Sequence, residues 1–195
     1  MRVIREQAGE REAVLMRWGL VPYWANGRSA NYSTINCRIE SMQTNASFRD
    51  AWRRGQRCIL PCAGFYEWRV RADGSKQPYY IRPVEEDASF AIAGLWDRSF
   101  TEQGEAMLSY TIITMPANEL LADIHNSQRR MPAILRREDV EVRLTGDAAA
   151  ARAALKPFAS GDMVAWPLST RVNSARNDGP DLIEPVQTDH KEDLE

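Results

Sequence analysis

One carboxylate in the sequence is surrounded by aromatic side chains, in the segment Gly64-Phe65-Tyr66-Glu67-Trp68. Burial among apolar rings without a counter-ion would raise the pKa of the Glu67 carboxyl. A carboxyl with a pKa near neutrality can act as a general acid or base. The alternative is an exposed glutamate on an edge strand, and the local sequence favours neither.

A histidine, His125, lies at the end of a predicted helix and is followed by the basic pair Arg129-Arg130. The partial negative charge at a helix C-terminus favours a charged histidine, which explains this placement without any catalytic role. The other histidine, His190, falls in an acidic tail and is assigned no role.

Three cysteines, Cys37, Cys58 and Cys62, form an odd and sparse set, which is typical of free thiols in a reducing compartment. Cys58 and Cys62 could be combined with His125, but that gives only three ligands at a spacing unlike that of zinc motifs. We therefore predict neither a metal nor a cofactor, and we interpret the cysteines as buried structural thiols.

The segment from residue 34 to residue 40 alternates like a strand and places Asn36, Arg38 and Glu40 on one face. The opposite face is apolar and consists of Ile35, Cys37 and Ile39. An entirely polar face is either solvated or part of a site, and the pattern alone favours the solvated face.

Short apolar and alternating runs dominate the sequence and predict β-strands. They cover residues 14–20, 57–60, 65–70, 79–81, 90–96 and 110–114. Two pairs of these strands are joined by the hairpin signals Ala72-Asp73-Gly74 and Glu102-Gln103-Gly104, whose glycines suit a positive φ. The sheet is therefore predicted to be largely antiparallel.

Three short helices are predicted, over residues 48–55, 116–125 and 147–155. The first follows the capping candidates Thr44, Asn45 and Ser47, and the second opens at Pro116. The predicted fold class is α+β, a single domain with a mainly antiparallel or barrel-like β core and a few short helices.

The composition indicates one globular domain, with 195 residues of which 44% are hydrophobic and 27% charged. The longest apolar run, residues 90–96, is too short to span a membrane, and the first twenty residues lack a secretory signal. We expect a location in the cytoplasm, associated with the nucleoid. The net charge of −2 comes from the acidic end, because residues 1–180 hold 24 basic against 21 acidic side chains. We predict a domain over residues 1–185 and a disordered acidic tail over residues 186–195.

Six ordered segments give the sequence a family resemblance. They are Trp18-Gly19-Leu20-Val21-Pro22-Tyr23-Trp24, Asn36-Cys37-Arg38-Ile39-Glu40, residues 57–68, Gln77-Pro78-Tyr79-Tyr80-Ile81, Ala93-Gly94-Leu95-Trp96 and residues 124–132. In this order they resemble the SRAP family (SOS response-associated peptidase domain), and the resemblance extends to Asn177-Asp178-Gly179-Pro180.

The resemblance implies a DNA-damage-response protein that recognises abasic sites in single-stranded DNA. The ring-opened sugar of such a site is an aldehyde, and an amino-terminal cysteine, exposed when the protein removes its own initiator methionine, would condense with it to a thiazolidine crosslink. By motif, Asn36 and Arg38 would hold the cysteine and the DNA phosphate. Glu67 would act as general acid and base, and His125 would assist opening of the sugar.

The resemblance also implies how the DNA is bound. Tyr23 and Trp24 resemble an aromatic wedge, which could stack on bases of any sequence. Arg130 and Arg38 would face the DNA backbone. We expect the protein to work as a monomer on single-stranded DNA.

Two departures accompany the resemblance. The family begins Met-Cys-Gly-Arg, whereas this sequence begins Met1-Arg2-Val3-Ile4, so we expect some amino-terminal residues to be missing and the chain as given to lack its nucleophile. The link from Asn126 to Arg130 is also longer than the family's usual Asp-Arg. Two alternatives remain open, a peptidase and a non-catalytic module that binds single-stranded DNA.

Overall fold

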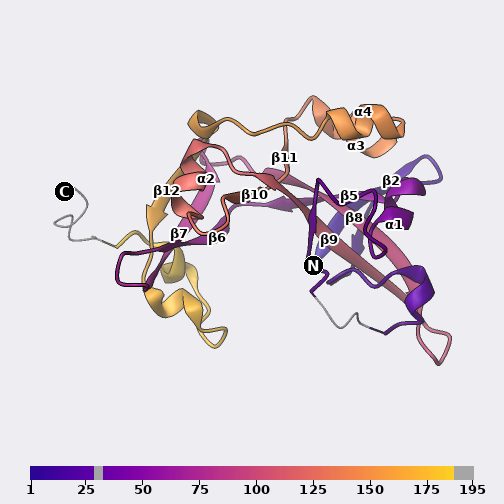
Figure 1. Cartoon of the computed structure of the whole chain (residues 1–195), viewed down its shortest axis with the longest axis horizontal. Coiled ribbons are helices and arrows are strands. Elements are labelled where there is room, and N and C mark those ends of the chain that lie inside the picture. Colours follow the sequence, from indigo (N-terminus) through magenta and orange to yellow (C-terminus); the bar gives the residue numbers. More distant parts are fainter. Residues whose placement is uncertain (29–32, 187–195) are drawn as a thin grey trace.

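The computed structural model describes residues 1–28 and 33–186. These residues form a nine-stranded sheet, a three-stranded sheet and four short α-helices, which confirms the predicted α+β class. The larger sheet lies on one side of the molecule and the smaller sheet on the other, with α3 and α4 above the larger sheet and α2 beside the smaller one (Figure 1).

The strands in chain order are β1 (Arg2–Gln7), β2 (Glu10–Leu15), β3 (Arg17–Trp18), β4 (Asn36–Arg38), β5 (Arg57–Cys62), β6 (Phe65–Val70), β7 (Lys76–Pro83), β8 (Phe90–Phe100), β9 (Ala106–Pro116), β10 (Arg130–Pro132), β11 (Ile134–Leu135) and β12 (Met163–Pro167). The α-helices are α1 (Arg49–Arg53), α2 (Glu119–Ile124), α3 (Asp139–Thr145) and α4 (Ala148–Ala153). The 3₁₀ helices are η1 (Tyr23–Ala25), η2 (Ser160–Asp162), η3 (Thr170–Asn173) and η4 (Pro180–Ile183).

The larger sheet has the order β10-β9-β8-β5-β1-β2, with β11 on β8 and with β3 and β4 on β9. Both predicted hairpin turns are confirmed, because Gly74 joins β6 to β7 with a φ of 80° and Gly104 joins β8 to β9 with a φ of 82°. The sheet is largely antiparallel, as predicted. Only β3 and β4 depart from this among the described strands, since both run parallel to β9.

The sequence patterns do not predict β1, which pairs with β2 and β5. Its buried face carries Val3 and Arg5, so a charged side chain occupies an inward position. The Arg5 guanidinium lies 4.2 Å from the ring centroid of Trp96 and is paired with Glu12. Arg5 can be buried because the Trp96 ring and the Glu12 carboxylate stabilise its charge. A charged residue at an inward position interrupts the apolar alternation by which a strand is predicted, so the sequence did not predict β1.

Strand β9 lies between β4 and β10. Thr114 pairs with Arg38 of β4 on one edge and with Pro132 of β10 on the other. One prediction about β4 is wrong, because Ile35 is 40% exposed rather than buried. The strand begins only at Asn36, and the Ile35 carbonyl accepts hydrogen bonds from the Ile112 backbone and from Trp18 Nε1.

The smaller sheet has the order β12-β7-β6 and is antiparallel. Tyr66, Tyr80 and Trp166 are in register across its three strands, with neighbouring ring centroids 5.6 and 5.3 Å apart. Because successive side chains on a strand alternate, Glu67 points to the opposite face from Tyr66. That opposite face is where α2 packs against β6.

The helices differ from the prediction at their starts. Pro116 does not open a helix but ends β9, and α2 begins after Asn118, whose side chain accepts a hydrogen bond from the Leu121 backbone. None of the capping candidates caps α1, because its N-cap residue is Phe48 and the Asn45 side chain instead accepts from the Ser47 backbone. Helix α3 was not predicted. Its charged residues include the buried Arg143, which obscured the apolar stripe.

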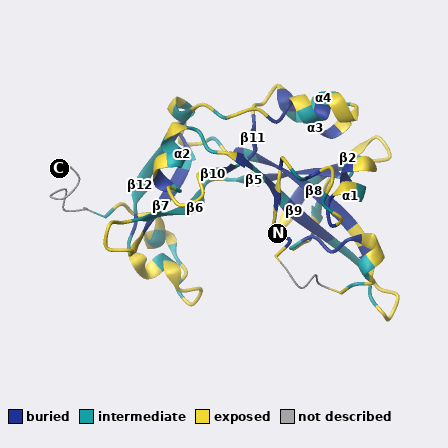
Figure 2. Cartoon of the chain, in the orientation of Figure 1, coloured by how far each residue is buried: buried dark blue, intermediate teal, exposed yellow. Residues whose placement is uncertain are grey.

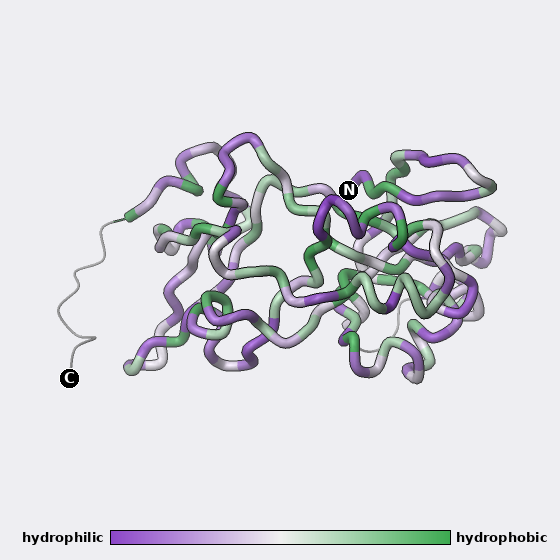
Figure 3. Tube along the Cα trace, turned by 90° about the horizontal axis from the view of Figure 1, so that it is seen from above, coloured by the Kyte–Doolittle hydropathy of each residue, from purple (hydrophilic) through white to green (hydrophobic). Residues whose placement is uncertain are grey.

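Strands β5, β8 and β9 hold most of the buried residues of the larger sheet, whereas β2, β3 and the hairpin ends are mostly exposed (Figure 2). Hydrophilic and hydrophobic stretches alternate along the chain (Figure 3). Within the described residues, no helix is long and apolar enough to cross a membrane. The predicted tail, apart from Val186, lies outside the described residues.

Candidate functional site

A pocket of about 350 Å³ contains both residues that the sequence singled out for proton transfer. Its lining residues are Glu67, Trp68, Val70, Lys76, His125, Ser127, Gln128 and Asn173. Strand β6 contributes the carboxylate, and the C-terminal end of α2 contributes the imidazole. The structure therefore brings together two groups that are far apart in the chain.

The Glu67 carboxyl has 20% of its side-chain surface exposed, which contradicts the alternative of a fully exposed edge residue. Burial raises its pKa above the usual glutamate value, while His125 and the Trp68 backbone N–H oppose that rise. A carboxyl of this kind keeps its proton to higher pH than an ordinary glutamate. It is suited to donating a proton to a leaving oxygen.

The His125 ring is oriented by two oxygen atoms. Its Nδ1 lies 3.0 Å from the backbone oxygen of Arg130 and 3.5 Å from Oε1 of Glu67. A carbonyl oxygen can only accept, so Nδ1 carries a hydrogen and donates it. This assigns the tautomer and leaves Nε2 as the ring nitrogen that can take up a proton.

The loop after His125 is fixed to β6, although it is longer than the family resemblance led us to expect. The Asn126 side chain accepts from the Val70 backbone N–H at 3.0 Å and donates to the Val70 carbonyl at 2.8 Å. Arg129 adopts a left-handed φ of 53°, and its carbonyl accepts from the Ala117 backbone. The extra residues thus form an anchored turn, which returns the chain to β10.

An ion pair connects the polar face of residues 36–40 to this region. Asn36, Arg38 and Glu40 are exposed, as the alternation predicted. The two carboxylate oxygens of Glu40 accept from two guanidinium nitrogens of Arg130, at 2.6 and 3.0 Å. Hydrogen bonding from Arg130 is the main cause of the lowered pKa of Glu40.

Arg130 consequently has a structural task besides any role on DNA. One of its guanidinium nitrogens also donates to the Thr114 carbonyl at 2.7 Å, and its own carbonyl orients His125. Glu40 therefore holds the side chain of the residue whose backbone carbonyl orients the histidine. Sequence reasoning placed Glu40 only on a polar face, because nothing in the sequence pairs it with Arg130.

The aromatic pair Tyr23 and Trp24 lies elsewhere, in η1, and each residue is 48% exposed. The Tyr23 backbone N–H donates to Asp97 of β8, a residue in register with Ser109 of β9. From Ser109 to Thr114, about five strand residues along β9, the distance is ~17 Å. The predicted DNA-binding residues are thus spread along the sheet rather than gathered in one pocket.

The three cysteines are unsuited to nucleophilic attack. Cys37 and Cys58 are buried and Cys62 is partly buried. Burial raises the pKa to about 12 for Cys37, to about 12 for Cys58 and to about 11 for Cys62. Over residues 1–28 and 33–186, no cluster of three or more His, Cys, Asp or Glu side chains has metal-binding geometry.

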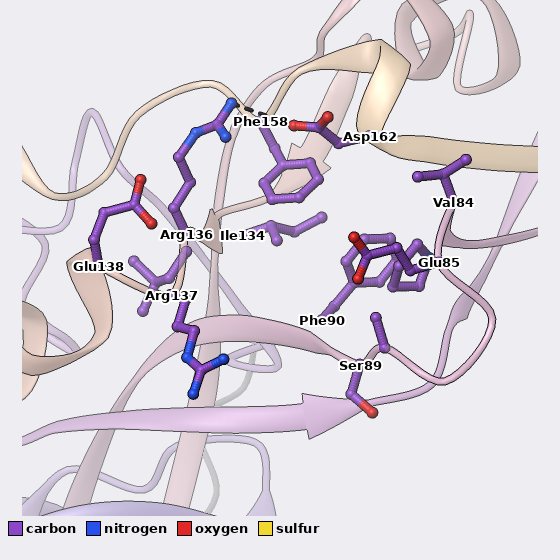
Figure 4. Close-up of a pocket in the computed structure, with 13 residues that line it drawn as sticks. Val84, Glu85, Ser89, Phe90, Ile134, Arg136, Arg137, Glu138, Phe158 and Asp162 are labelled. Atoms are coloured by element: carbon purple, nitrogen blue, oxygen red, sulfur yellow. Dashed lines mark ion pairs between the residues drawn. The ribbon is translucent and has the colours of Figure 1, made fainter.

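A second pocket, of about 330 Å³, holds none of the predicted site residues. Phe90, Ile134 and Phe158 line its apolar interior, and charged residues surround its opening (Figure 4). Arg136 forms an ion pair with Asp162 at 3.3 Å across this opening. It lies apart from the pocket that contains Glu67 and His125.

Comparison with known proteins points to one family. The family model described as SOS response associated peptidase (SRAP) matches residues 1–175. The chain is 38% identical to the abasic site processing protein YoqW of Bacillus subtilis, over 87% of this chain and 75% of that protein. It is 35% identical to the abasic site processing protein HMCES of Gallus gallus, over 94% of this chain and 61% of that protein.

The fold is also similar to solved structures. A crystal structure of a Bacteroides thetaiotaomicron protein superposes with a TM-score of 0.81 at 29% identity, covering 95% of this chain and 81% of that one. A Bordetella bronchiseptica protein gives a TM-score of 0.77 at 32% identity, over 86% and 83% of the two chains.

Proposed function

The chain belongs to the SRAP (SOS response associated peptidase) family, and from that premise we propose that it processes abasic sites in single-stranded DNA during the response to DNA damage. The observation that carries the proposal is the half-buried Glu67 carboxyl beside the oriented imidazole of His125. Chemistry at an abasic sugar requires protons to be added and removed at oxygen atoms, and this pair can do both.

The proposed reaction joins the abasic aldehyde to a 1,2-aminothiol, the amino-terminal cysteine of the family. The amine adds to the aldehyde carbon, and water leaves to give an iminium ion. The thiolate then adds to the same carbon and closes a thiazolidine ring. Nε2 of His125 takes the hydroxyl proton when the sugar ring opens, and the ring oxygen receives a proton in return. Glu67 donates the proton that departs with water, and the resulting carboxylate takes the thiol proton when the sulfur adds.

The exposed polar face of β4 suits the strand that carries the lesion. Arg38 is exposed and offers a guanidinium fork to a phosphate, and Asn36 on the same face holds the cysteine end. The loop that carries Tyr23 contacts β9 at Ser109, whereas Arg38 pairs with Thr114 further along the same strand. We infer that single-stranded DNA contacts the protein at both places.

One experiment tests this function. The chain is incubated with an oligonucleotide containing one abasic site, with an intact oligonucleotide of the same sequence, and with casein. We expect preferential binding of the abasic single strand and no casein cleavage. Equal affinity for both oligonucleotides would favour a general single-strand binding module, and cleaved casein would favour a peptidase.

The salt dependence of binding gives a second test. A net charge near +3 over residues 1–180 is too small for general attraction to DNA, so we expect about three to five phosphate contacts. On a single strand these give a slope of log K against log salt of about −2 to −3.5. Arg38→Ala should flatten the slope by about 0.7, whereas Trp24→Ala should lower affinity and leave the slope unchanged.

Fluorescence anisotropy over a salt series measures both slopes. The matched control is Arg137→Ala, which removes an exposed arginine at the rim of the second pocket. It should keep the wild-type slope. An Arg38→Ala slope equal to that of the wild type would remove Arg38 from the DNA path.

A further inference from the structure

The loop that carries Tyr23 and Trp24 is hydrogen-bonded to buried side chains of β8 and β9. The backbone N–H of Val21 donates to Ser109 Oγ at 2.8 Å, that of Tyr23 to Asp97 Oδ2 at 3.0 Å, and that of Gly27 to Ser99 Oγ at 2.9 Å. The three acceptors are 1% exposed or less. We call these three acceptors the loop clamp.

The loop clamp occupies positions where a strand normally buries apolar side chains. Asp97 and Ser99 are two residues apart on one face of β8, and Ser109 of β9 is in register with Asp97. Burying a polar group costs free energy unless it is hydrogen-bonded. Each of these three side chains accepts a hydrogen bond from the backbone of the same loop. Their polar groups therefore hold that loop in place.

The backbone of the loop is restricted further at its end. Asn26 and Gly27 have φ values of 49° and 76°. A Cβ atom on Gly27 would lie 2.9 Å from Cα of Thr101, so only glycine fits against the β8–β9 turn. The loop is therefore packed on the hairpin rather than held at its ends alone.

Asp97 is the centre of this arrangement. Its carboxylate accepts from one guanidinium nitrogen of Arg54 at 3.0 and 2.9 Å, from Tyr23 N–H, and from Arg98 N–H at 2.7 Å. The same Arg54 guanidinium lies 4.3 Å from the centroid of the Tyr23 ring. Asp97 thus fixes the backbone of Tyr23 directly and its ring through Arg54.

We propose that Asp97, Ser99 and Ser109 are positioning residues that hold Tyr23 and Trp24 as a preformed platform on which unpaired bases of single-stranded DNA stack. The inference rests on the proposed function. A fixed loop loses little conformational entropy when a base stacks on it, so more of the stacking free energy appears as affinity. Tyr23 and Trp24 are each 48% exposed, so both keep free surface on which a base can stack.

A double-mutant cycle tests the proposal by anisotropy with an unmodified single-stranded oligonucleotide. Asp97→Asn keeps the side-chain volume but weakens the charge-assisted bonds to Arg54 and to two backbone N–H groups. Stacking of one base is worth about 5- to 160-fold in Kd, and Asp97→Asn should lose a large part of this factor. In a Tyr23→Ala/Trp24→Ala background, Asp97→Asn should change Kd by less than about twofold.

A purely structural role for Asp97 would give the same loss of affinity in both backgrounds, and that result would overturn the proposal. If Asp97→Asn does not fold, the same cycle is measured with Ser99→Ala, which removes only the hydrogen-bond acceptor of the Gly27 backbone N–H. Its matched control is Ser169→Ala, which removes a serine acceptor for the Arg171 backbone in η3 and should bind DNA like the wild type.

The possible results also distinguish a failure of this inference from a failure of the proposed function. If the double alanine variant weakens binding but neither clamp variant does, the loop clamp alone is wrong. If the wild-type chain does not bind single-stranded DNA, the proposed function fails and the platform fails with it.

Discussion

The 195-residue chain is expected to leave abasic single-stranded DNA without a covalent adduct, whereas a version extended at its amino terminus to the cysteine of a related SRAP protein is expected to form one. A thiazolidine needs an amine and a thiol on neighbouring carbons, which only an amino-terminal cysteine provides. Cys37, Cys58 and Cys62 have no free α-amine. We therefore expect no adduct with the 195-residue chain and nearly complete conversion with the extended chain.

The thiol groups of the described cysteines give the second reason. Because burial raises the pKa of Cys37 and Cys58 to about 12 and that of Cys62 to about 11, very little thiolate exists at pH 7. Cys62, the least buried of the three, is the one that could still react slowly.

A denaturing gel after heating measures the adduct. Borohydride should be included in a parallel sample, because it traps an imine formed by any amine and so distinguishes that product from a thiazolidine. A heat-stable band with the 195-residue chain would contradict the prediction. Loss of that band in Cys62→Ala would then identify an internal nucleophile.

Much of the fold could be predicted because its signals are local. The glycine turns between β6 and β7 and between β8 and β9 fix two antiparallel hairpins, and both turns are present. The sequence also predicted correctly that α2 ends at His125. The start of that helix was not, because Pro116 suits the last residue of a strand as well as the first turn of a helix.

Two of the elements that were missed contain buried charged side chains. Arg5 in β1 and Arg143 in α3 occupy inward positions and so interrupt the apolar pattern that predicts an element. The parallel pairing of β4 with β9 has no sequence signal, since it depends on contacts between distant segments.

The candidate site, too, could be predicted from the sequence only in part. An aromatic setting for Glu67 is visible in five consecutive residues, but its approach to His125 depends on how α2 packs on β6. The pairing of Glu40 with Arg130 and the hydrogen bonds of Asp97 are likewise tertiary. A charged residue in a strand pattern does not reveal its partner, so these positioning roles became visible only in the structure.

Replacing Glu67 by glutamine is expected to slow crosslink formation by about 10²-fold or more in the cysteine-bearing chain. Glutamine keeps the shape of the side chain but cannot donate a proton to the departing water. Because burial raises the pKa of Glu67, the wild-type rate should fall as the pH rises through that raised value. The variant should lose this pH dependence.

Single-turnover rates with an abasic oligonucleotide between pH 5 and 8 measure this effect. The reverse reaction should slow by a similar factor, since the same proton is returned when the crosslink opens. Asp123→Asn is a suitable control, because it removes an exposed carboxyl on α2 while leaving Glu67 and His125 in place. A Glu67→Gln rate equal to the wild-type rate across this range would exclude the catalytic role.

Thermal unfolding of the same variant separates a catalytic carboxyl from a structural one. A folded-state pKa raised by burial means that the folded chain binds the Glu67 proton more tightly than the unfolded chain does. The resulting stabilisation is complete below the unfolded pKa of about 4.3 and is lost as the pH rises through the folded value.

Glu67→Gln lacks this loss, so its Tm should increase relative to that of the wild type between pH 4 and pH 8. A variant that is slower and yet gains relative stability with pH would indicate that the Glu67 carboxyl is retained for chemistry at a cost to stability. A Tm difference that moves the other way would mean that the ionised Glu67 mainly stabilises the fold through His125.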